Sequence, residues 1–170
     1  MRRILALIAV TVLAALVWAN WPADILPAGT KADRVLVEKD AHMLTLFNGT
    51  AVLKKYAVSL GRVPIGPKQR EGDKKTPEGI YHILLHKPDS SYHRALQVSY
   101  PELEDVARAR SQGVNPGSEI MVHGLPNGWG LIGRAHLLSD WTAGCIAVTN
   151  PEIEEIYTAV ADGTVIEIRK

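Results

Sequence analysis

Residues 34–61 alternate apolar and polar side chains with the period of two that is typical of β-strands. Two alternating stretches, residues 35–38 and 42–47, are separated by a weak turn signal at Asp40-Ala41. Asn48-Gly49 is a strong hairpin signal, because both residues tolerate a positive φ. The pattern therefore predicts β-strands joined by tight turns at the start of the folded domain.

Residues 61–79 break this pattern. The segment is rich in Gly, Pro and Lys, has no apolar period and is long for a connection, which is typical of a functional lid or a binding loop. Strand patterns return at residues 80–87, 118–124 and 164–170.

Two segments carry helix signals. In residues 100–113 Pro101 suits a first turn, arginines stand late, and Gly113 is a stop signal. In residues 150–163 Asn150 is the expected N-cap, and Gly163 the expected stop. The chain is therefore expected to form one mostly β, α+β domain with two helices over residues 30–170.

Residues 1–29 are set apart from this domain. Arg2 and Arg3 precede an unbroken apolar run at residues 4–19, and Ala19 fits a signal-peptidase cleavage site. The run is shorter than the roughly 20 residues that a spanning helix needs. Two alternatives remain open: a cleaved signal for Sec export, or a retained anchor that is the only contact with the inner membrane.

Composition excludes one class of partner. The 170 residues carry a formal net charge of +1, with 46% hydrophobic and 22% charged residues. This is a globular composition without the basic excess of a nucleic-acid-binding domain, so no nucleic-acid partner is expected.

Cys145, in "SDWTAGCIAVTN", is the only cysteine of the chain. A single thiol outside the cytoplasm is a buried apolar side chain, half of an intermolecular disulfide, or a nucleophile. A nucleophile needs help, because only a few per cent of a free thiol is ionised near pH 7. His123, at the end of a strand and 22 positions earlier, is the best placed imidazole to give it.

The residues before the cysteine suit an oxyanion-binding turn. Gly144 permits tight backbone geometry, and the N–H groups of Ala143, Gly144 and Cys145 are candidates to converge on a developing oxyanion. Thr142 is expected to support this turn by hydrogen bonding.

Three stretches together resemble the L,D-transpeptidase catalytic domain, also called the YkuD domain. They are "GRVPIGPKQREGDKKTPEGIY" (61–81), "VHG" (122–124) and "TAGCIAVTN" (142–150), and the likeness covers roughly residues 33–169. The "DWTxGC" form is similar to a Gram-negative subgroup of the family. The resemblance implies a curved mixed sheet or β-sandwich with two helices.

The resemblance also implies roles for individual residues. Cys145 would be the acyl-accepting nucleophile and His123 the general base and later acid. The Gly124 carbonyl would orient the imidazole, and Gly144 and Cys145 would give oxyanion N–H groups. Ala143 departs from the family pattern, which has histidine before Gly-Cys, and this departure leaves the acyl acceptor open.

The sequence indicates the substrate-binding residues less specifically than Cys145 and His123. Four residues are candidate substrate contacts, the two arginines as ligands of a substrate carboxylate: His136, Arg134, Trp141 and Arg94. The basic residues of the long loop are either a solvated surface or contacts for stem-peptide carboxylates: Lys68, Arg70, Lys74 and Lys75. His82 and His86 could share one face of a strand and could be read with His93 as metal ligands. No metal is expected, because no third ligand lies at a recognised spacing from the first two.

The expected function is acyl transfer on peptidoglycan stem peptides in the periplasm, through a thioester on Cys145 and without a cofactor. An amine acceptor makes a crosslink or anchors a wall protein. Two alternatives stay open: a hydrolase that uses the same Cys-His pair to cut such links, and a non-catalytic wall-binding module with an inert cysteine.

Overall fold

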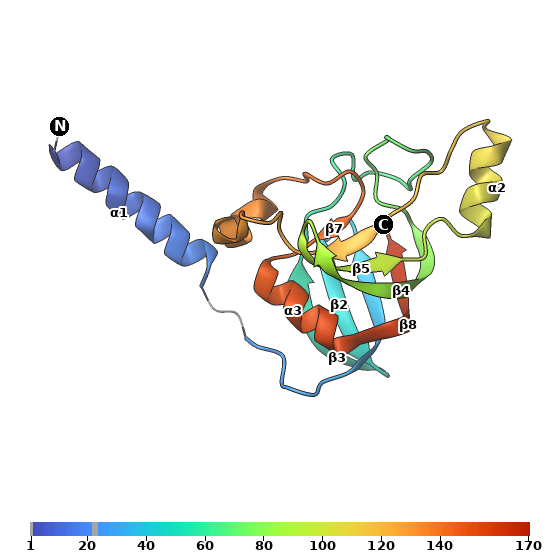
Figure 1. Cartoon of the computed structure of the whole chain (residues 1–170), viewed down its shortest axis with the longest axis horizontal. Coiled ribbons are helices and arrows are strands. Elements are labelled where there is room, and N and C mark those ends of the chain that lie inside the picture. The colour runs from blue at the N-terminus through green and yellow to red at the C-terminus, as the bar shows by residue number, and fades with distance from the viewer. Residues whose placement is uncertain (1, 22–23) are drawn as a thin grey trace.

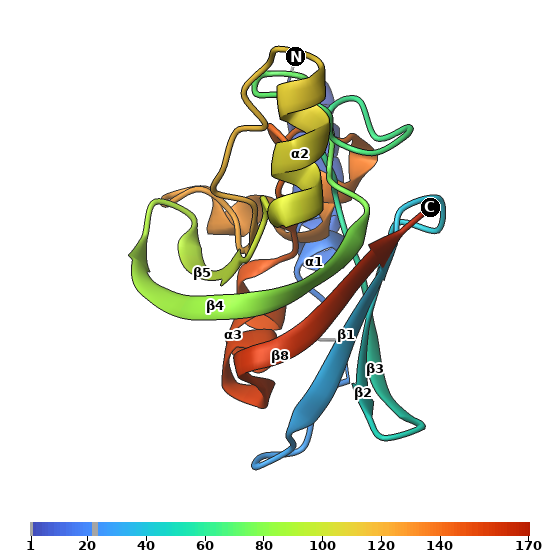
Figure 2. The same cartoon turned by 90° about the vertical axis from the view of Figure 1, so that its right-hand side faces the viewer.

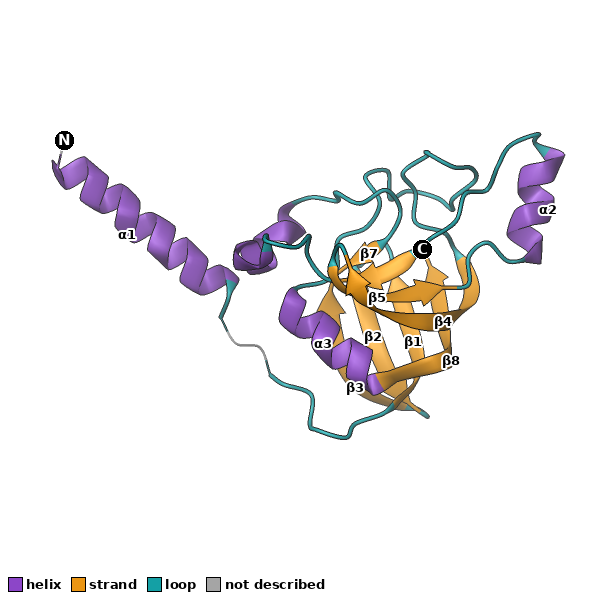
Figure 3. Ribbon diagram, viewed as in Figure 1, coloured by secondary structure: helices purple, strands orange, loops and turns teal. Residues whose placement is uncertain are grey.

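The computed structural model describes residues 2–21 and 24–170, and within them eight strands form one sheet (Figures 1 and 3). The order of the strands across the sheet is β3-β2-β1-β8-β4-β5-β6-β7. The strands are β1 (Ala32–Glu38), β2 (Met43–Asn48), β3 (Ala51–Ala57), β4 (Gly79–Ser90), β5 (His93–Val98), β6 (Met121–His123), β7 (Ile146–Ala147) and β8 (Val160–Arg169).

The sheet is mixed and strongly curved. β1 and β8 are parallel, as are β6 and β7, and the other neighbours are antiparallel. The long strand β4 produces the curve, because its residues 79–82 pair with β8 whereas residues 83–90 pair with β5. Figure 2 shows β4 as a bent band between the two halves of the sheet. The expected α+β fold with a curved mixed sheet is confirmed.

The helices of the described chain are α1 (Arg2–Ala19), α2 (Leu103–Ser111) and α3 (Asn150–Ala159), and a 3-10 segment, η1, spans Gly130–Leu138. α3 packs against β5 and leads directly into β8 (Figure 1). It buries Ile153, Ile156 and Ala159. None of the helices in the described parts of the chain is both long and apolar enough to cross a membrane.

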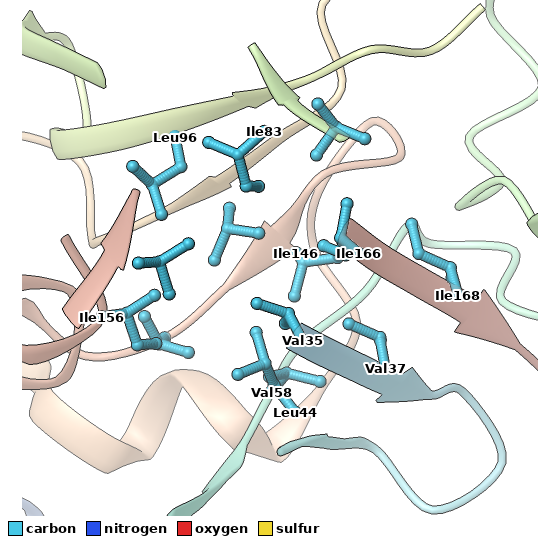
Figure 4. Packing of buried hydrophobic residues seen from close by; sticks show 14 of the residues in the cluster. Val35, Val37, Leu44, Val58, Ile83, Leu96, Ile146, Ile156, Ile166 and Ile168 are labelled. Carbon is cyan, nitrogen blue, oxygen red and sulfur yellow. The ribbon is translucent and has the colours of Figure 1, made fainter. Parts of the chain in front are cut away.

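One apolar core joins the two halves of the curved sheet. Figure 4 shows Val35 of β1 and Ile166 of β8 near Ile146 of β7, with Ile83 of β4 and Leu96 of β5 on the far side. All five side chains are at most 1% exposed. Removing this apolar surface from water stabilises the fold, at about 25 cal/mol per Å², and fixes β7 and the residues just before it against the rest of the sheet.

The hairpin predicted at Asn48-Gly49 is confirmed: Asn48 pairs with Ala51, and Gly49 has φ +56°. The predicted helix at 100–113 is confirmed with a shorter span. It begins at Leu103, after a capping box of Glu102 and Asp105, so Pro101 precedes the helix and does not belong to its first turn.

The cap assigned to Asn150 is wrong. Thr149 is the N-cap residue, and its N–H donates to Glu152 Oε2 over 2.9 Å. The Asn150 Oδ1 atom instead accepts the Leu125 N–H over 2.8 Å. The helix also ends at Ala159, before Gly163, because Val160 already pairs with Ala32 as the first residue of β8.

Candidate active site

The turn that carries Cys145 is held by the Thr142 hydroxyl. This hydroxyl donates to the Cys145 carbonyl over 2.8 Å and accepts the Gly144 N–H over 3.1 Å. The expectation that Thr142 supports the turn is therefore confirmed. The core-packed strand β7 follows at once, so the turn projects from a rigid element.

Gly144 is required by two features of this turn. Its φ is +136°, a conformation that L side chains rarely adopt, and a Cβ built there would lie 2.6 Å from the Lys75 carbonyl oxygen. The long loop therefore lies directly against the cysteine turn, and only a glycine lets the two backbones approach so closely.

We expect Gly144→Ala to destabilise the fold more than Gly72→Ala does. Gly72 also has a positive φ, +75°, but a Cβ there would meet nothing within 4 Å. Both variants bear the cost of the backbone conformation, and only Gly144→Ala adds the clash, for an excess of about 2 kcal/mol. Urea unfolding measures both free energies, and equal losses would contradict the close contact at Gly144.

His123 ends strand β6 and lies between two neighbouring strands, paired with Ala95 of β5 and Ala147 of β7. Its Nδ1 atom is 2.6 Å from the Gly124 carbonyl oxygen. A carbonyl only accepts, so Nδ1 carries the hydrogen and the lone pair of the neutral ring is on Nε2. The contact expected from the Gly124 carbonyl is therefore present.

Gly124 also lets α3 pack against the site. A Cβ at this position would lie 2.9 Å from Asn150 Oδ1 and 3.0 Å from Ile153 Cγ2. The glycine after His123 thus serves both the imidazole, through its carbonyl, and the helix, through its lack of a side chain.

Cys145 and His123 line one pocket of about 340 Å³. Its walls are Arg62, Lys74, Tyr92, His123, Trp141, Thr142, Ala143 and Cys145. Tyr92 and Trp141 confine the imidazole, with ring centroids 4.5 Å and 5.7 Å from that of His123. The structure thus brings together the thiol, the imidazole and Trp141, as expected.

Burial keeps both reactive groups neutral. Burial raises the pKa of the Cys145 thiol above its ordinary value, although a backbone hydrogen bond from Met121 opposes this. Burial also lowers the pKa of His123 to about 4, against the opposing effect of the Gly124 hydrogen bond. The thiol lies 3.6 Å from the Glu119 carbonyl oxygen and donates to it. Both shifts favour a thiol and a neutral imidazole as the resting pair.

The oxyanion assignment needs one correction. The Gly144 N–H is already engaged by Thr142 Oγ1, so it is not a free donor. No hydrogen bond from the N–H of Ala143 or Cys145 to another described residue is found. These two amides, out of the three expected, remain available to an oxyanion.

His136 is not part of the same pocket. It is 5% exposed and lines a neighbouring cavity of about 330 Å³, which shares only Trp141 with the pocket of the thiol. Its Nδ1 atom lies 3.1 Å from Ser59 Oγ and 3.4 Å from Trp141 Nε1. His136 thus contacts the site through the indole of Trp141.

The two expected substrate-binding arginines lie elsewhere. Arg94 pairs with Glu154 over 2.9 Å and covers the Tyr157 ring at 4.8 Å. Arg134 lines a cavity between the end of α1 and α3, together with Glu152 and Glu155. Neither arginine lines the pocket of the thiol, and each lies near carboxylates of α3.

Of the four basic residues of the long loop, only Lys74 lines the pocket. Lys68 is instead buried in an ion pair with Asp73. Sequence reasoning missed Arg62, which lines the pocket because residue 61 bridges to Thr142. That pairing joins segments 81 positions apart and leaves no local signal in the sequence.

The model of the L,D-transpeptidase catalytic domain (YkuD) matches residues 32–168 of the chain. YafK of Escherichia coli (strain K12), which carries the provisional name of an L,D-transpeptidase, is 33% identical over 116 residues. That alignment covers 67% of this chain but only 39% of YafK, so the chain spans about two fifths of the length of this curated relative.

Two solved structures resemble the fold. The helical cell shape determining protein Pgp2 from Campylobacter jejuni superposes with a TM-score of 0.64 and 25% identity, over 92% of this chain and 54% of that one. Bd1075 from Bdellovibrio bacteriovorus gives a TM-score of 0.55 and 26% identity, over 87% and 52% of the two chains.

Proposed function

Because the chain belongs to the L,D-transpeptidase catalytic domain family, we propose that it transfers acyl groups of peptidoglycan stem peptides through a thioester on Cys145. One observation carries the proposal: Cys145 and His123 line the same pocket, and the Gly124 carbonyl holds the imidazole with its Nε2 lone pair free. A pocket of this kind suits nucleophilic catalysis with a general base.

The reaction begins from neutral partners. His123 Nε2 takes the thiol proton as the sulfur attacks a carbonyl carbon of the stem peptide, and the N–H groups of Ala143 and Cys145 bind the oxyanion. Collapse of the tetrahedral adduct breaks the peptide C–N bond, and the leaving amine takes the proton from His123. A second nucleophile then gives its proton to His123 as it attacks the thioester carbonyl, and collapse of this adduct breaks the C–S bond while His123 returns the proton to the Cys145 sulfur.

The second nucleophile defines the product. An amine makes a crosslink or anchors a wall protein, and this transpeptidation is the proposed reaction. Hydrolysis by water is the second candidate. It is favoured by Ala143, which is exposed at the pocket and offers no polar side chain to orient an incoming amine.

The proposed setting is the periplasm, with residues 1–29 as the Sec export segment. The substrate is the stem peptide of the wall, and a wall-anchored protein is the proposed macromolecular partner. The proposed steps use only the side chains and amides of this chain and call for no cofactor.

Mass spectrometry of the full chain, incubated with disaccharide-tetrapeptides and with crosslinked muropeptides, tests the proposal. We expect a covalent adduct on Cys145, followed by a crosslinked product. An adduct followed only by shortened or uncrosslinked products would establish the hydrolase. The absence of an adduct with both substrates would contradict acyl transfer on stem peptides and favour a wall-binding module.

A further inference from the structure

Two hydrogen bonds hold Arg62 against the turn that carries Cys145. Its backbone N–H donates to the Thr142 carbonyl over 3.1 Å, and its Nε donates to the Trp141 carbonyl over 3.1 Å. The guanidinium is therefore fixed at the edge of the pocket, with its two terminal nitrogens beyond the tethered Nε. A guanidinium presented in this way is suited to bidentate pairing with a planar anion.

Lys74 reaches the same pocket from the opposite arm of the loop. Its φ is +58°, a conformation that few residues other than glycine adopt. Its carbonyl accepts the Val63 N–H over 3.1 Å, and a Cβ on Gly61 would lie 2.3 Å from the same oxygen. The missing side chain at position 61 thus allows the backbones of the two cationic residues to lie side by side.

Neither cation is neutralised. Among the described residues, no carboxylate pairs with Arg62 or with Lys74. None of the residues that line the pocket is acidic. Lys68, in the same loop, is by contrast paired with Asp73 over 2.9 Å. Two unpaired cations that line the pocket of the thiol are suited to bind an anion there.

We propose that Arg62 and Lys74 form a binding site for a carboxylate of the acyl-donor peptide and thereby select donors that carry such a group near the scissile bond. The inference rests on the proposed function, whose substrates are peptides. The carboxylate has two sources on a stem peptide, the terminal α-carboxyl group and a side-chain carboxyl group. The guanidinium binds the carboxylate directly, and the ammonium adds a second charge.

In the proposal, the two cations act on the substrate. The charged groups that act most on the Cys145 thiol are Lys68 and Glu119. The reaction of Cys145 with iodoacetamide in Arg62→Gln is therefore compared with that in the wild type. This reaction also reports whether the variant keeps an intact pocket.

Peptide binding to full-length Cys145→Ala protein, measured by calorimetry, tests the site without any covalent step. Three tetrapeptides are compared: one with free carboxylates, one amidated at the C-terminus and one amidated at the side chain. Arg62→Gln should weaken binding of the free peptide about tenfold. One of the two amidations should weaken binding to the parent protein by the same factor and should cost nothing further in Arg62→Gln. That amidation identifies the source of the carboxylate.

Arg110→Gln is the matched control, because Arg110 is an exposed arginine on α2, away from the pocket. It should bind all three peptides as the parent does. Equal losses for free and amidated peptides in Arg62→Gln, or no loss for either, would overturn the carboxylate site. Failure of the proposed function is seen separately, as the absence of a Cys145 adduct in a protein that still binds these peptides.

Discussion

Replacing Cys145 with alanine is expected to abolish the covalent adduct and to lower turnover of stem peptides at least about 10⁴-fold. Cys145 is the only thiol of the chain, so no second cysteine can replace it. What remains is binding in the pocket and the oxyanion donors, which alone accelerate acyl transfer only modestly. Intact-protein mass spectrometry and product analysis by liquid chromatography measure both losses.

The fold of Cys145→Ala should be intact. The side chain is only partly exposed, and its sulfur donates one weak hydrogen bond to the Glu119 carbonyl over 3.6 Å and accepts one from the Met121 backbone. The melting temperature is therefore expected to change by no more than a few degrees. Cys145→Ser is the matched control: it keeps the shape of the side chain but is a far weaker nucleophile. Wild-type turnover in the alanine variant would show that the nucleophile lies elsewhere.

The proposed catalytic pair, Cys145 and His123, was accessible from the sequence because both residues stand in short motifs that, together with residues 61–81, resemble a known family. A histidine at the end of an apolar strand and a cysteine after a glycine each carry their signal within three residues. The structure adds the physical reason for both glycines: Gly124 leaves room for Asn150, and Gly144 leaves room for the Lys75 carbonyl.

The surroundings of the pair were not accessible, because they depend on contacts between distant segments. Arg62 reaches the pocket only through the pairing of residue 61 with Thr142. Arg94 is withdrawn from it by Glu154, which lies 60 positions further along the chain. A sequence shows that an arginine is present, but not which carboxylate has already engaged it.

Helix ends show the same limit. Asn150 is a good N-cap by propensity, yet its side chain accepts the N–H of Leu125, in the loop after His123. Thr149 caps the helix in its place. A tertiary hydrogen bond near the candidate active site thus overrides the local capping preference of Asn150, and the neighbouring Thr149 provides the N-cap.

The stability of the fold is expected to fall as the pH is lowered from about 6.5 to about 4. Burial lowers the pKa of His123 to about 4, and burial together with the nearby His123 lowers that of His136 to about 4. Both groups titrate near 6.5 in the unfolded chain, which therefore binds protons in this window that the folded chain does not. The stability that each neutral histidine gives is complete above pH 6.5 and is lost as the pH falls to about 4. The loss is about 3 kcal/mol per histidine.

His136 offers the cleaner test, because it lines no part of the thiol pocket. The Nδ1 atom of its ring contacts Ser59 Oγ and Trp141 Nε1, whereas Nε2 is buried without a partner among the described residues. A second proton on this ring would add a buried charge with no counter-ion. Urea unfolding of His136→Gln between pH 7 and pH 4.5 should therefore show a shallower pH dependence than the wild type, by up to about 1.4 kcal/mol per pH unit.

His82→Gln is the control, because His82 is exposed on β4. It should keep the wild-type slope of unfolding free energy against pH. The His136→Gln substitution is expected to lower stability at pH 7, since it removes the contacts of the ring with Trp141 and Ser59, so the slope and not the absolute free energy carries the test. If His136→Gln and His82→Gln gave the same slope as the wild type, the acid sensitivity of the fold would have to come from other groups, and His136 would not be held neutral by burial.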